Sequence, residues 1–447
     1  MSKATMIAVI GGACAGSEFA GKLAEAGHEV FVFEQNQLPY GKIEDGLPRW
    51  HEKLQRREMD LIDQRLDREG VHFIPNCRLG EDLTIEQLRR EWGFPIVVMA
   101  NGAWKDRGVR LEGLDQVKDQ SFLYQNPFVY WFNHYQDANY SGPTYTIKPG
   151  TVIFGGGLAS IDVAKICQFE LALQKLRDHG IDENVVQLEH YGLAKTAEKH
   201  NLSPEIFDFE PAVIVYRRRI EDMPLVPLDD DADEARLEKA KMVRKKIIAN
   251  ATDRYGFRVL PLHVPKRLIT EQGSVTGVEL QQTKIENGRV ILQGETYVQP
   301  TSCVISSIGS IPEPIDGVNM VGELYDTSDK TTGALNQIEG VYCAGNAITG
   351  KGNIKASLKS AQNLAGLTLA GLENTDAAHQ AAMEAQREET RVHVAKLLDY
   401  AGSLPEMSPD VKASIRTRIA AMQLDRKFVS YRDWRDKTWQ QRHPNPA

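Results

Sequence analysis

The most constraining feature of the sequence is a strand–turn–helix–strand pattern over residues 5–34. The run Met6 to Ile10 has the length and β-branched character of a buried strand. Ser17 to Ala26 carries apolar residues at helical spacing, and Gly27 is placed to end that helix in a left-handed conformation. Val30 to Phe33 then predicts a second buried strand. This is the opening unit of a parallel α/β sheet.

The turn of this unit, Gly11-Gly12-Ala13-Cys14-Ala15-Gly16, predicts a pyrophosphate site. Gly11 permits a tight turn, and Gly16 lets the helix pack closely on the strand, so that the helix N-terminus offers free N–H groups to phosphates. Glu34 follows 23 residues after Gly11, where a carboxylate accepts hydrogen bonds from ribose hydroxyls. Ala13 departs from the usual glycine where the backbone comes nearest the phosphates. An ordinary strand–helix turn is the alternative interpretation.

Composition restricts the class of protein. A chain of 447 residues predicts two or three domains, and 42% hydrophobic with 26% charged residues is typical of a globular protein. A net charge of −8 argues against nucleic acid as a general partner. The sequence has no apolar run of bilayer length and no signal-peptide organisation at its start, so we expect no membrane association and a cytoplasmic location.

The five cysteines are scattered and include no Cys-x-x-Cys pair. We therefore expect no metal centre, neither iron–sulfur nor zinc, and no redox-active disulfide.

The opening pattern returns at Thr151, and this internal repeat is the second strong constraint. Val152 to Phe154 predicts a strand, Gly155 to Gly157 a turn, and Leu158 to Phe169 a helix, with Ser160 in the place of the third glycine. Ala212 to Tyr216 predicts the second strand of this unit.

Three arginines, Arg217, Arg218 and Arg219, follow that strand where an acid would select a free ribose. Guanidinium groups bind phosphate bidentately, whereas an acid would repel a 2′-phosphate. The second unit therefore favours NADP(H) over NAD(H), although a solvated strand end is the alternative. Hydride transfer from a nicotinamide within one chain points to a flavin on the first unit.

Seven motifs occur in order between about residues 5 and 370: IGGACAG, LPYGKIEDGLPRWH, ANGA followed by Asp106-Arg107, FVYWFN, VIFGGGLASIDVAK, VIVYRRR and VYCAGNAITGKGNI. With these motifs the chain resembles the adrenodoxin-reductase type of ferredoxin–NADP⁺ reductase and, more distantly, the small subunit of glutamate synthase. The tail segment VSYRDW, residues 429–434, also resembles a motif of the bacterial members.

The resemblance implies an α/β fold of two nested, three-layer Rossmann-like domains, the two-dinucleotide-binding flavoprotein fold. It places the FAD-binding domain at residues 1–115 and 318–447, with a helical tail from about residue 372. The NADPH-binding domain, residues 116–317, is inserted between these segments. We interpret the aromatic stretch Ser121 to Tyr135 as a crossing between the domains, and the alternation over Arg258 to Pro300 as antiparallel strands.

Together with the turn chemistry, the resemblance assigns residues to each cofactor. The FAD set is Gly11, Gly12, Ala13, Cys14, Ala15, Gly16, Glu34, Gln35, Gly41, Lys42, Leu47, Asn101, Gly102, Gly345, Asn346, Gly352, Asn353 and Ile354. The NADP set is Gly155, Gly156, Gly157, Leu158, Ala159, Ser160, Arg217, Arg218 and Arg219.

Two positions of the FAD domain allow alternative interpretations. Asn346 stands where the adrenodoxin-reductase type has Trp and the glutamate-synthase type has Asp, although an Asn can still bond a flavin phosphate or ribitol. His51 falls on the active-site histidine of the family, and a loop histidine without a catalytic role is the alternative. Backbone N–H groups of Gly352, Asn353 and Ile354 would stabilise negative charge on the reduced flavin, which places them with His51 as catalytic candidates.

The electron acceptor in the resembled family is an acidic ferredoxin, and a flavodoxin or another redox protein fits the same chemistry. Candidate docking residues are Arg236, Lys239, Lys241, Arg244, Lys245, Lys246, Lys351, Lys355 and Lys359. The acidic run Asp229 to Asp233 beside them argues against that surface.

Three functions therefore stay open. The first is an FAD enzyme that exchanges hydride with NADP(H) and single electrons with a ferredoxin-like protein. The second is the NADPH-oxidising subunit of a larger redox complex, although the N-terminal cysteine clusters of the glutamate-synthase type are absent from the sequence. The third is a non-catalytic flavin or NADPH sensor.

Overall fold

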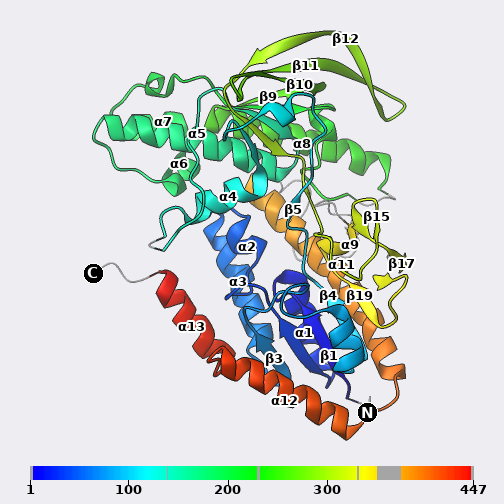
Figure 1. Ribbon diagram of the computed structural model, residues 1–447. Coiled ribbons are helices and arrows are strands. Elements are labelled where there is room, and N and C mark those ends of the chain that lie inside the picture. Colours follow the sequence, from blue (N-terminus) through cyan, green and yellow to red (C-terminus); the bar gives the residue numbers. More distant parts are fainter. Residues whose placement is uncertain (1–3, 138, 229–231, 330–331, 350–373, 444–447) are drawn as a thin grey trace.

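The computed structural model describes residues 4–137, 139–228, 232–329, 332–349 and 374–443. Two parallel sheets form the centres of two units that lie one above the other in Figure 1. The lower unit holds the N-terminal strands, and the upper unit holds the middle of the chain. This arrangement confirms the predicted α/β fold with two dinucleotide-binding units.

The lower sheet has seven strands in the order β17-β18-β19-β4-β1-β2-β3. Its strands are β1 (Met6–Ile10), β2 (Glu29–Phe33), β3 (Val71–Ile74), β4 (Ile96–Met99), β17 (Thr327–Asp329), β18 (Ala334–Leu335) and β19 (Val341–Cys343). The strands from β19 to β3 are parallel, and β17 and β18 add an antiparallel edge. Strand β1 pairs with β2 on one side and β4 on the other, so the order reverses there. Ligands of such sheets bind at the carboxyl ends of the strands at this reversal.

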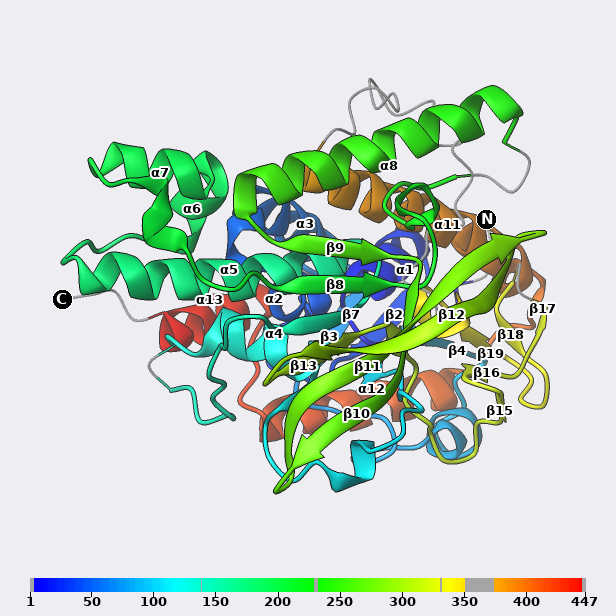
Figure 2. The same ribbon diagram turned by 90° about the horizontal axis from the view of Figure 1, so that it is seen from above.

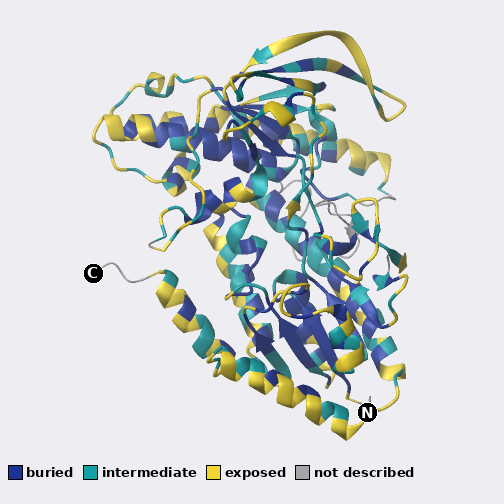
Figure 3. Ribbon diagram, viewed as in Figure 1, coloured by how far each residue is buried: buried dark blue, intermediate teal, exposed yellow. Residues whose placement is uncertain are grey.

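Alternate residues of these strands face two separate cores. On one face, Val9 and Val32 pack with Phe19 of α1 (Cys14–Glu25) and Ile62 of α3 (Glu52–Leu66). On the other face, residues such as Phe31 pack with the short π-helical segment η2 (Gln87–Glu91) and with α12 (Pro409–Asp425). The sheet is thus buried on both sides, as all-parallel strands require (Figure 3).

The upper sheet has five parallel strands in the order β6-β13-β7-β8-β9. They are β6 (Phe122–Tyr124), β7 (Val152–Gly155), β8 (Val213–Tyr216), β9 (Arg258–Pro261) and β13 (Val304–Ser307). The helices of this unit are α4 (Gln125–His134), α5 (Leu158–Asp178), α6 (Val185–Tyr191), α7 (Leu193–Lys199) and α8 (Glu234–Tyr255). Figure 2 shows β8 and β9 side by side with α8 along one flank of the sheet.

Two interpretations of this region need correction. The stretch Ser121 to Tyr135 is not a crossing between domains, because it forms the edge strand β6 and helix α4, whose Phe128 and Phe132 lie in the upper core. Arg258–Pro261 is a parallel strand, so the antiparallel pattern begins only after it, in β10 (His263–Glu271), β11 (Ser274–Glu286) and β12 (Arg289–Pro300). The aromatic content of the first stretch reflects burial, not a linker.

The remaining short elements complete the connections. They are α2 (Lys42–Asp45), α9 (Asn346–Thr349), β5 (Lys105–Asp106), β14 (Ser310–Ile311), β15 (Met320–Val321), β16 (Leu324–Tyr325), and the 3₁₀ turns η1 (Arg49–His51), η3 (Leu114–Gln116), η4 (Pro204–Phe207) and η5 (Ile220–Asp222). Strands β5 and β14 pair antiparallel where the chain passes between the units. The exact domain boundaries at residues 115/116 and 317/318 stay a prediction.

The described part of the tail is helical, as predicted: α11 (Thr375–Ser403), α12 and α13 (Tyr431–Arg442). Ser408 caps α12 by accepting the Asp410 N–H, as the Ser-Pro pair predicts. Helix α11 connects the units, because Ala378 and Ala381 at its start lie in the upper core while Val394 and Leu397 lie in the lower one. No helix of the described residues is long and apolar enough to cross a membrane.

Buried ion pairs fasten α11 to the lower unit. Arg387 donates to Glu58 of α3 at 2.6 Å, Arg391 donates to Glu18 of α1 at 3.1 Å, and both carboxylates are almost fully buried. Arg57 of α3 also pairs with Glu384 of α11. Removing one partner of such a pair leaves an uncompensated buried charge.

We expect Arg387→Met to lower the free energy of unfolding by about 3 kcal/mol, because Glu58 then loses its main counter-ion inside the protein. Arg432→Met is the matched control, since Arg432 is 71% exposed and its pair with Asp67 contributes at most about 1 kcal/mol. Urea unfolding of both variants measures the difference. Equal decreases in the free energy of unfolding would show that the buried pair contributes no more to stability than the exposed pair.

Candidate functional site

The first glycine turn packs as closely as the sequence predicts. Gly11 has a φ of +90°, and a Cβ there would lie 2.7 Å from the carbonyl oxygen of Ala100 on the neighbouring strand connection. A Cβ at Gly16 would overlap the carbonyl oxygen of Gly11. Only glycine fits either position, and this contact brings the N-terminus of α1 directly against the end of β1.

Glu34 sits at the end of β2 beside this turn. Its carboxylate accepts the Gly12 N–H at 2.8 Å and the Asn36 N–H at 2.9 Å, and the side chain is buried. Burial raises the pKa of Glu34 to about 7, although these N–H donors oppose the shift. Further donors, such as ribose hydroxyls, would stabilise the charged carboxylate.

A cavity of about 510 Å³ opens at the reversal of strand order. The predicted FAD residues that line it are Gly11, Ala13, Cys14, Ala15, Glu34, Gln35, Gly41, Lys42, Leu47, Asn101, Gly102 and Asn346. Ala159, predicted for the second cofactor, also lines it, so the start of α5 reaches the same cavity. Among the other predicted FAD residues, Gly12 contributes its N–H to Glu34, Gly16 packs behind the turn, and Gly345 has a φ of +61° just before α9. Gly352, Asn353 and Ile354 lie outside the described residues.

The cavity also has a lining that the sequence analysis missed: Tyr40, Trp104, Gln125, Asn126, Val129, the loop 77–81, the segment 313–316, Met383 and Gln386. Two of these groups could have been predicted from their positions in the sequence. The loop 77–81 follows strand β3 at the carboxyl edge of the sheet, and Trp104 follows the ANGA motif. Met383 and Gln386 belong to α11, and nothing in their local sequence indicates a site.

Two polar groups of the lining support a polar ligand. The side-chain oxygen of Asn101 is buried and has no hydrogen-bond partner among the described residues, while its amide donates to Tyr325 at 3.0 Å. Gln386 donates to the side chain of Asn346 at 3.3 Å, which fixes Asn346 at the cavity.

The thiol of Cys14 stays neutral because burial raises its pKa to about 12. The five cysteines are all free.

The second glycine turn contains two packed glycines and one open glycine. A Cβ at Gly155 would overlap Ser160 and Ser307, and a Cβ at Gly156 would overlap the ring of Tyr216. Ser160 replaces the third glycine without strain, because its hydroxyl donates to the Ser307 carbonyl at 3.1 Å. Gly157 has ordinary backbone angles and open space around its Cβ position. Packing does not require a glycine at 157, whereas a ligand that approaches the backbone would.

The three arginines at the end of β8 differ in their hydrogen bonds and ion pairs. Arg219 pairs with Asp222 at 3.1 Å, and Arg218 donates to the carbonyl of Gly288 at 2.8 Å. Arg217 is exposed and forms no ion pair with the described residues. Leu158 at the start of α5 is buried in the upper core. Arg217 is therefore the guanidinium most available to a phosphate.

His51 does not line the cavity. Its side chain is buried between three elements, with Nε2 3.2 Å from Asp162 of α5 and Nδ1 2.7 Å from Asp376 of α11. His379 of α11 also contacts Asp162, at 2.8 Å. Burial opposes the charge on His51, but Asp162 and Asp376 outweigh it and raise its pKa to about 9. His51 therefore joins helices α5 and α11, and its catalytic role stays a prediction.

Three atoms of this cluster, on His51, Asp162 and His379, lie within 4.8 Å of one another. The Asp162 carboxylate is contacted by His51 and His379, and the Lys165 ammonium lies 4.0 Å from it. His51 and Lys165 supply positive charge to the carboxylate, so we interpret the cluster as an ion-pair network and assign no metal to it.

Comparisons with known proteins agree with this geometry. The chain is 24% identical over 384 residues to the mitochondrial NADPH:adrenodoxin oxidoreductase of Arabidopsis thaliana, covering 77% of each chain. It is 25% identical over 373 residues to the glutamate synthase [NADPH] small chain of Bacillus subtilis, covering 80% of this chain and 66% of that one. The predicted resemblance is confirmed. No family model matches the sequence.

Solved structures agree on the fold. The oxidoreductase FprA of Mycobacterium tuberculosis, in complex with NADPH, superposes with a TM-score of 0.67 at 19% identity. The match covers 97% of this chain and 93% of FprA. The two-dinucleotide-binding architecture is thereby confirmed over nearly the whole chain, including the tail helices.

We expect the free energy of unfolding to fall by about 3 kcal/mol as pH rises from 6.5 through 9, because folded His51 holds a proton that an unfolded histidine has lost. The contribution is fully present below pH 6.5. His379 acts in the opposite direction, since burial lowers its pKa and its contribution is lost as pH falls. Urea unfolding of the wild type and of His51→Gln at pH 6.5, 8 and 9.5 isolates the effect. Identical pH slopes in both proteins would contradict it.

Proposed function

We propose that the protein is an FAD-dependent oxidoreductase that moves hydride between NADP(H) and FAD and passes single electrons to a ferredoxin-like protein. The observation that carries the proposal is the shared cavity, which is lined by the first glycine turn and also by Ala159 at the start of α5. A nucleotide on each turn would extend toward the same space. One relative is named as an NADPH:adrenodoxin oxidoreductase and another as a glutamate synthase [NADPH] small chain, and both names support chemistry with NADPH.

The residues present fit FAD. The glycine turn leaves room for a pyrophosphate at the N-terminus of α1, Glu34 can accept ribose hydroxyls, and Asn101 offers an unpaired buried oxygen. Bound FAD would supply the ring that takes up hydride and releases electrons one at a time. The chain itself would contribute orientation through lining residues such as Gly41, Leu47 and Asn346.

The second turn fits NADP(H). Gly157 leaves the N-terminus of α5 open, and Arg217 and Arg218 lie at the end of the adjacent strand β8. A 2′-phosphate there would gain charge-assisted hydrogen bonds that NAD(H) cannot make. Stopped-flow reduction of the FAD-loaded protein without oxygen, with NADPH and then NADH, tests the whole proposal. Unchanged flavin colour with both nucleotides would support a sensor instead of an enzyme.

A role as the subunit of a larger complex is favoured by one comparison, the match to a glutamate synthase small chain over 80% of this chain. Size-exclusion chromatography of the protein purified from its own cells separates the two cases. A single peak near 50 kDa supports a free reductase, whereas co-elution with a second catalytic chain supports a subunit.

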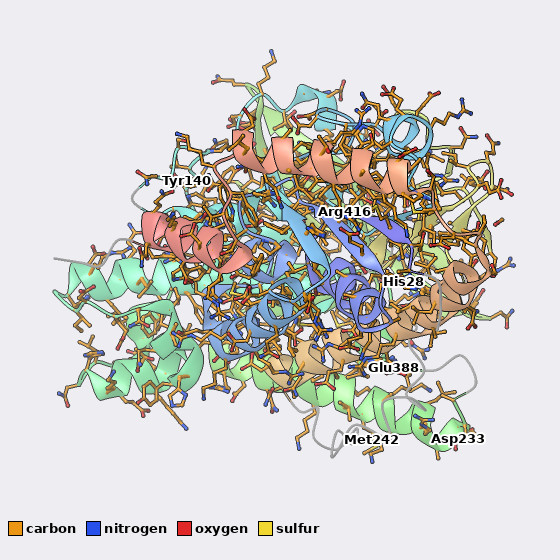
Figure 4. The ribbon with its side chains drawn as sticks, turned by 90° about the horizontal axis from the view of Figure 1, so that it is seen from below. His28, Tyr140, Asp233, Met242, Glu388 and Arg416 are labelled. Atoms are coloured by element: carbon orange, nitrogen blue, oxygen red, sulfur yellow. The ribbon has the colours of Figure 1, made fainter. Side chains whose placement is uncertain are left out.

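Helix α8 is the proposed surface for the acidic partner. Lys239, Lys245 and Lys246 are exposed, and they surround Met242, which is 69% exposed and projects outward in Figure 4. Charged residues around an exposed apolar side chain are typical of electron-transfer docking, where the contact is small and steered by charge. Arg244 fits less well than predicted, because its guanidinium donates to the Glu221 carbonyl. Lys351, Lys355 and Lys359 lie outside the described residues.

Arg217→Ser should raise the NADPH concentration for half-maximal flavin reduction about tenfold or more, because one or two charge-assisted hydrogen bonds to phosphate are lost. Arg218→Ser should act in the same direction but less, since Arg218 is already bonded to Gly288. The NADH requirement should stay within about twofold. Arg258→Ser, which removes a surface guanidinium paired with Glu210 at the far end of the upper sheet, is the control. An equal rise in the NADPH and NADH concentrations needed for half-maximal reduction would contradict the assignment of Arg217 to the 2′-phosphate.

Lys239→Glu combined with Lys245→Glu should raise the KM for an acidic ferredoxin about tenfold at low salt, because two attractive charges become repulsive. NADPH-dependent reduction of ferricyanide, a small acceptor that needs no docking, should be unchanged. Lys195→Glu with Lys199→Glu on α7 is the control of equal charge change. Equal ferredoxin KM values for both double variants would exclude α8 as the docking surface.

A further inference from the structure

Lys42, the first residue of α2, lines the cavity, and its ammonium group is held by neutral partners. Its ammonium lies 3.1 Å from the side-chain oxygen of Asn126 and 2.9 Å from the hydroxyl of Ser310. It also lies 5.7 Å from the centre of the Trp104 ring. Its two hydrogen-bonding partners are neutral, and no carboxylate of the described residues forms an ion pair with it.

An ammonium has three N–H donors, and two of them are used by Asn126 and Ser310. The third has no acceptor among the described residues. Lys42 is half-buried at the cavity, so a ligand there can accept this N–H and complete its hydrogen bonds. Because Lys42 lines the cavity, the acceptor is expected from the cofactor.

Two carboxylates lie near enough to affect the charge of Lys42. Asp106 of β5 accepts the Asn126 N–H at 3.2 Å, and burial raises its pKa to about 6. Asp45 of α2 is engaged by His134 at 3.0 Å. Burial lowers the pKa of Lys42 to about 8, and both carboxylates oppose that shift. Neither carboxylate neutralises the ammonium by direct contact.

The position of Lys42 along the cavity identifies the part of the cofactor that it meets. The pyrophosphate belongs at α1 and the adenine ribose at Glu34, so the adenine extends toward the loop 77–81 beyond β3. Lys42 instead contacts Asn126 of α4 in the upper unit and Ser310 of β14, which follows the upper strand β13, and Ala159 at the start of α5 lines the same cavity. A nicotinamide on the second glycine turn would approach from the upper unit, so we expect the isoalloxazine at this side of the cavity.

We propose that Lys42 contacts the isoalloxazine and stabilises the negative charge that this ring gains on reduction. The third N–H of the ammonium would donate to a ring acceptor, while Asn126 and Ser310 hold the side chain in place. An uncompensated positive charge in a partly desolvated site favours the more negative form of its neighbour. Lys42 would thereby raise the flavin potential and ease hydride uptake from NADPH. This inference rests on the proposed function.

The test uses the full-length, FAD-loaded protein in four forms: wild type, Lys42→Gln, Lys42→Met and Lys42→Arg. Lys42→Gln keeps the hydrogen bonds to Asn126 and Ser310 without the charge, and Lys42→Arg keeps the charge. Sulfite is the probe, because its lone pair forms a bond to N5 of the oxidised ring and the negative charge moves to the N1 and C2-carbonyl region. A nearby cation therefore tightens sulfite binding without any turnover.

We expect the dissociation constant for sulfite to rise about tenfold or more in Lys42→Gln and Lys42→Met and to recover in Lys42→Arg. The midpoint potential of bound FAD, measured by dye equilibration, should become more negative in the same two variants. Lys105→Met, which removes an exposed lysine of β5 that does not line the cavity, should change neither value.

The outcomes separate this inference from the proposed function. If the wild type binds FAD and is reduced by NADPH, but Lys42→Gln keeps its sulfite affinity and its potential, then Lys42 has only a structural role and the inference is overturned. If the wild type takes up no FAD, the proposed function fails first. Should Lys42→Met not fold, the comparison of Lys42→Gln with Lys42→Arg still decides.

Discussion

The close approach of helix α1 to strand β1 at Gly16 and Gly11 is the contact on which the rest of the structure depends. Because no side chain fits between the helix and the Gly11 carbonyl, the first N–H groups of α1 lie directly over the end of β1. The carboxylate of Glu34 is then held by the N–H of Gly12 beside them. The same packing recurs around Gly155 in the upper unit. One cavity is lined by the first of these turns and also by Ala159, just after the second turn.

The tail helices set how the two units are joined. Helix α11 places residues in both cores and supplies His379 and Asp376 to the cluster around Asp162, while Met383 and Gln386 reach the cofactor cavity. Helix α13 reaches the loop before α2, where Trp434 donates to the Gln37 carbonyl at 2.7 Å and Tyr431 donates to Asp63, which also holds Tyr40. The loop that carries Gly41 and Lys42 is therefore fixed from outside by the end of the chain. Cofactor binding and tail docking should be energetically linked.

Much of the local structure could be predicted from the sequence. Positive φ at Gly11 and Gly27, the two glycine turns and the Ser408 cap follow from rules that involve a few neighbouring residues. Contacts between segments that are distant in the sequence could not be predicted from such local rules. The contacts of His51 with Asp162 and Asp376, each more than a hundred residues away in the sequence, have no local signal, and its catalytic role stays a prediction. Aromatic density at Ser121 to Tyr135 likewise reflects core packing that only the sheet order reveals. Gln386 carried no signal, since a polar residue on a long charged helix is usually solvated.

The central claim is that one chain holds two dinucleotides at once, each on its own glycine turn, in a shared cavity. Native mass spectrometry of the FAD-loaded protein titrated with NADP⁺ measures this most directly. The prediction is a complex that carries one FAD and one NADP⁺ together, with FAD fully retained as NADP⁺ binds. Displacement of FAD by NADP⁺, or a protein that never carries more than one nucleotide, would contradict it.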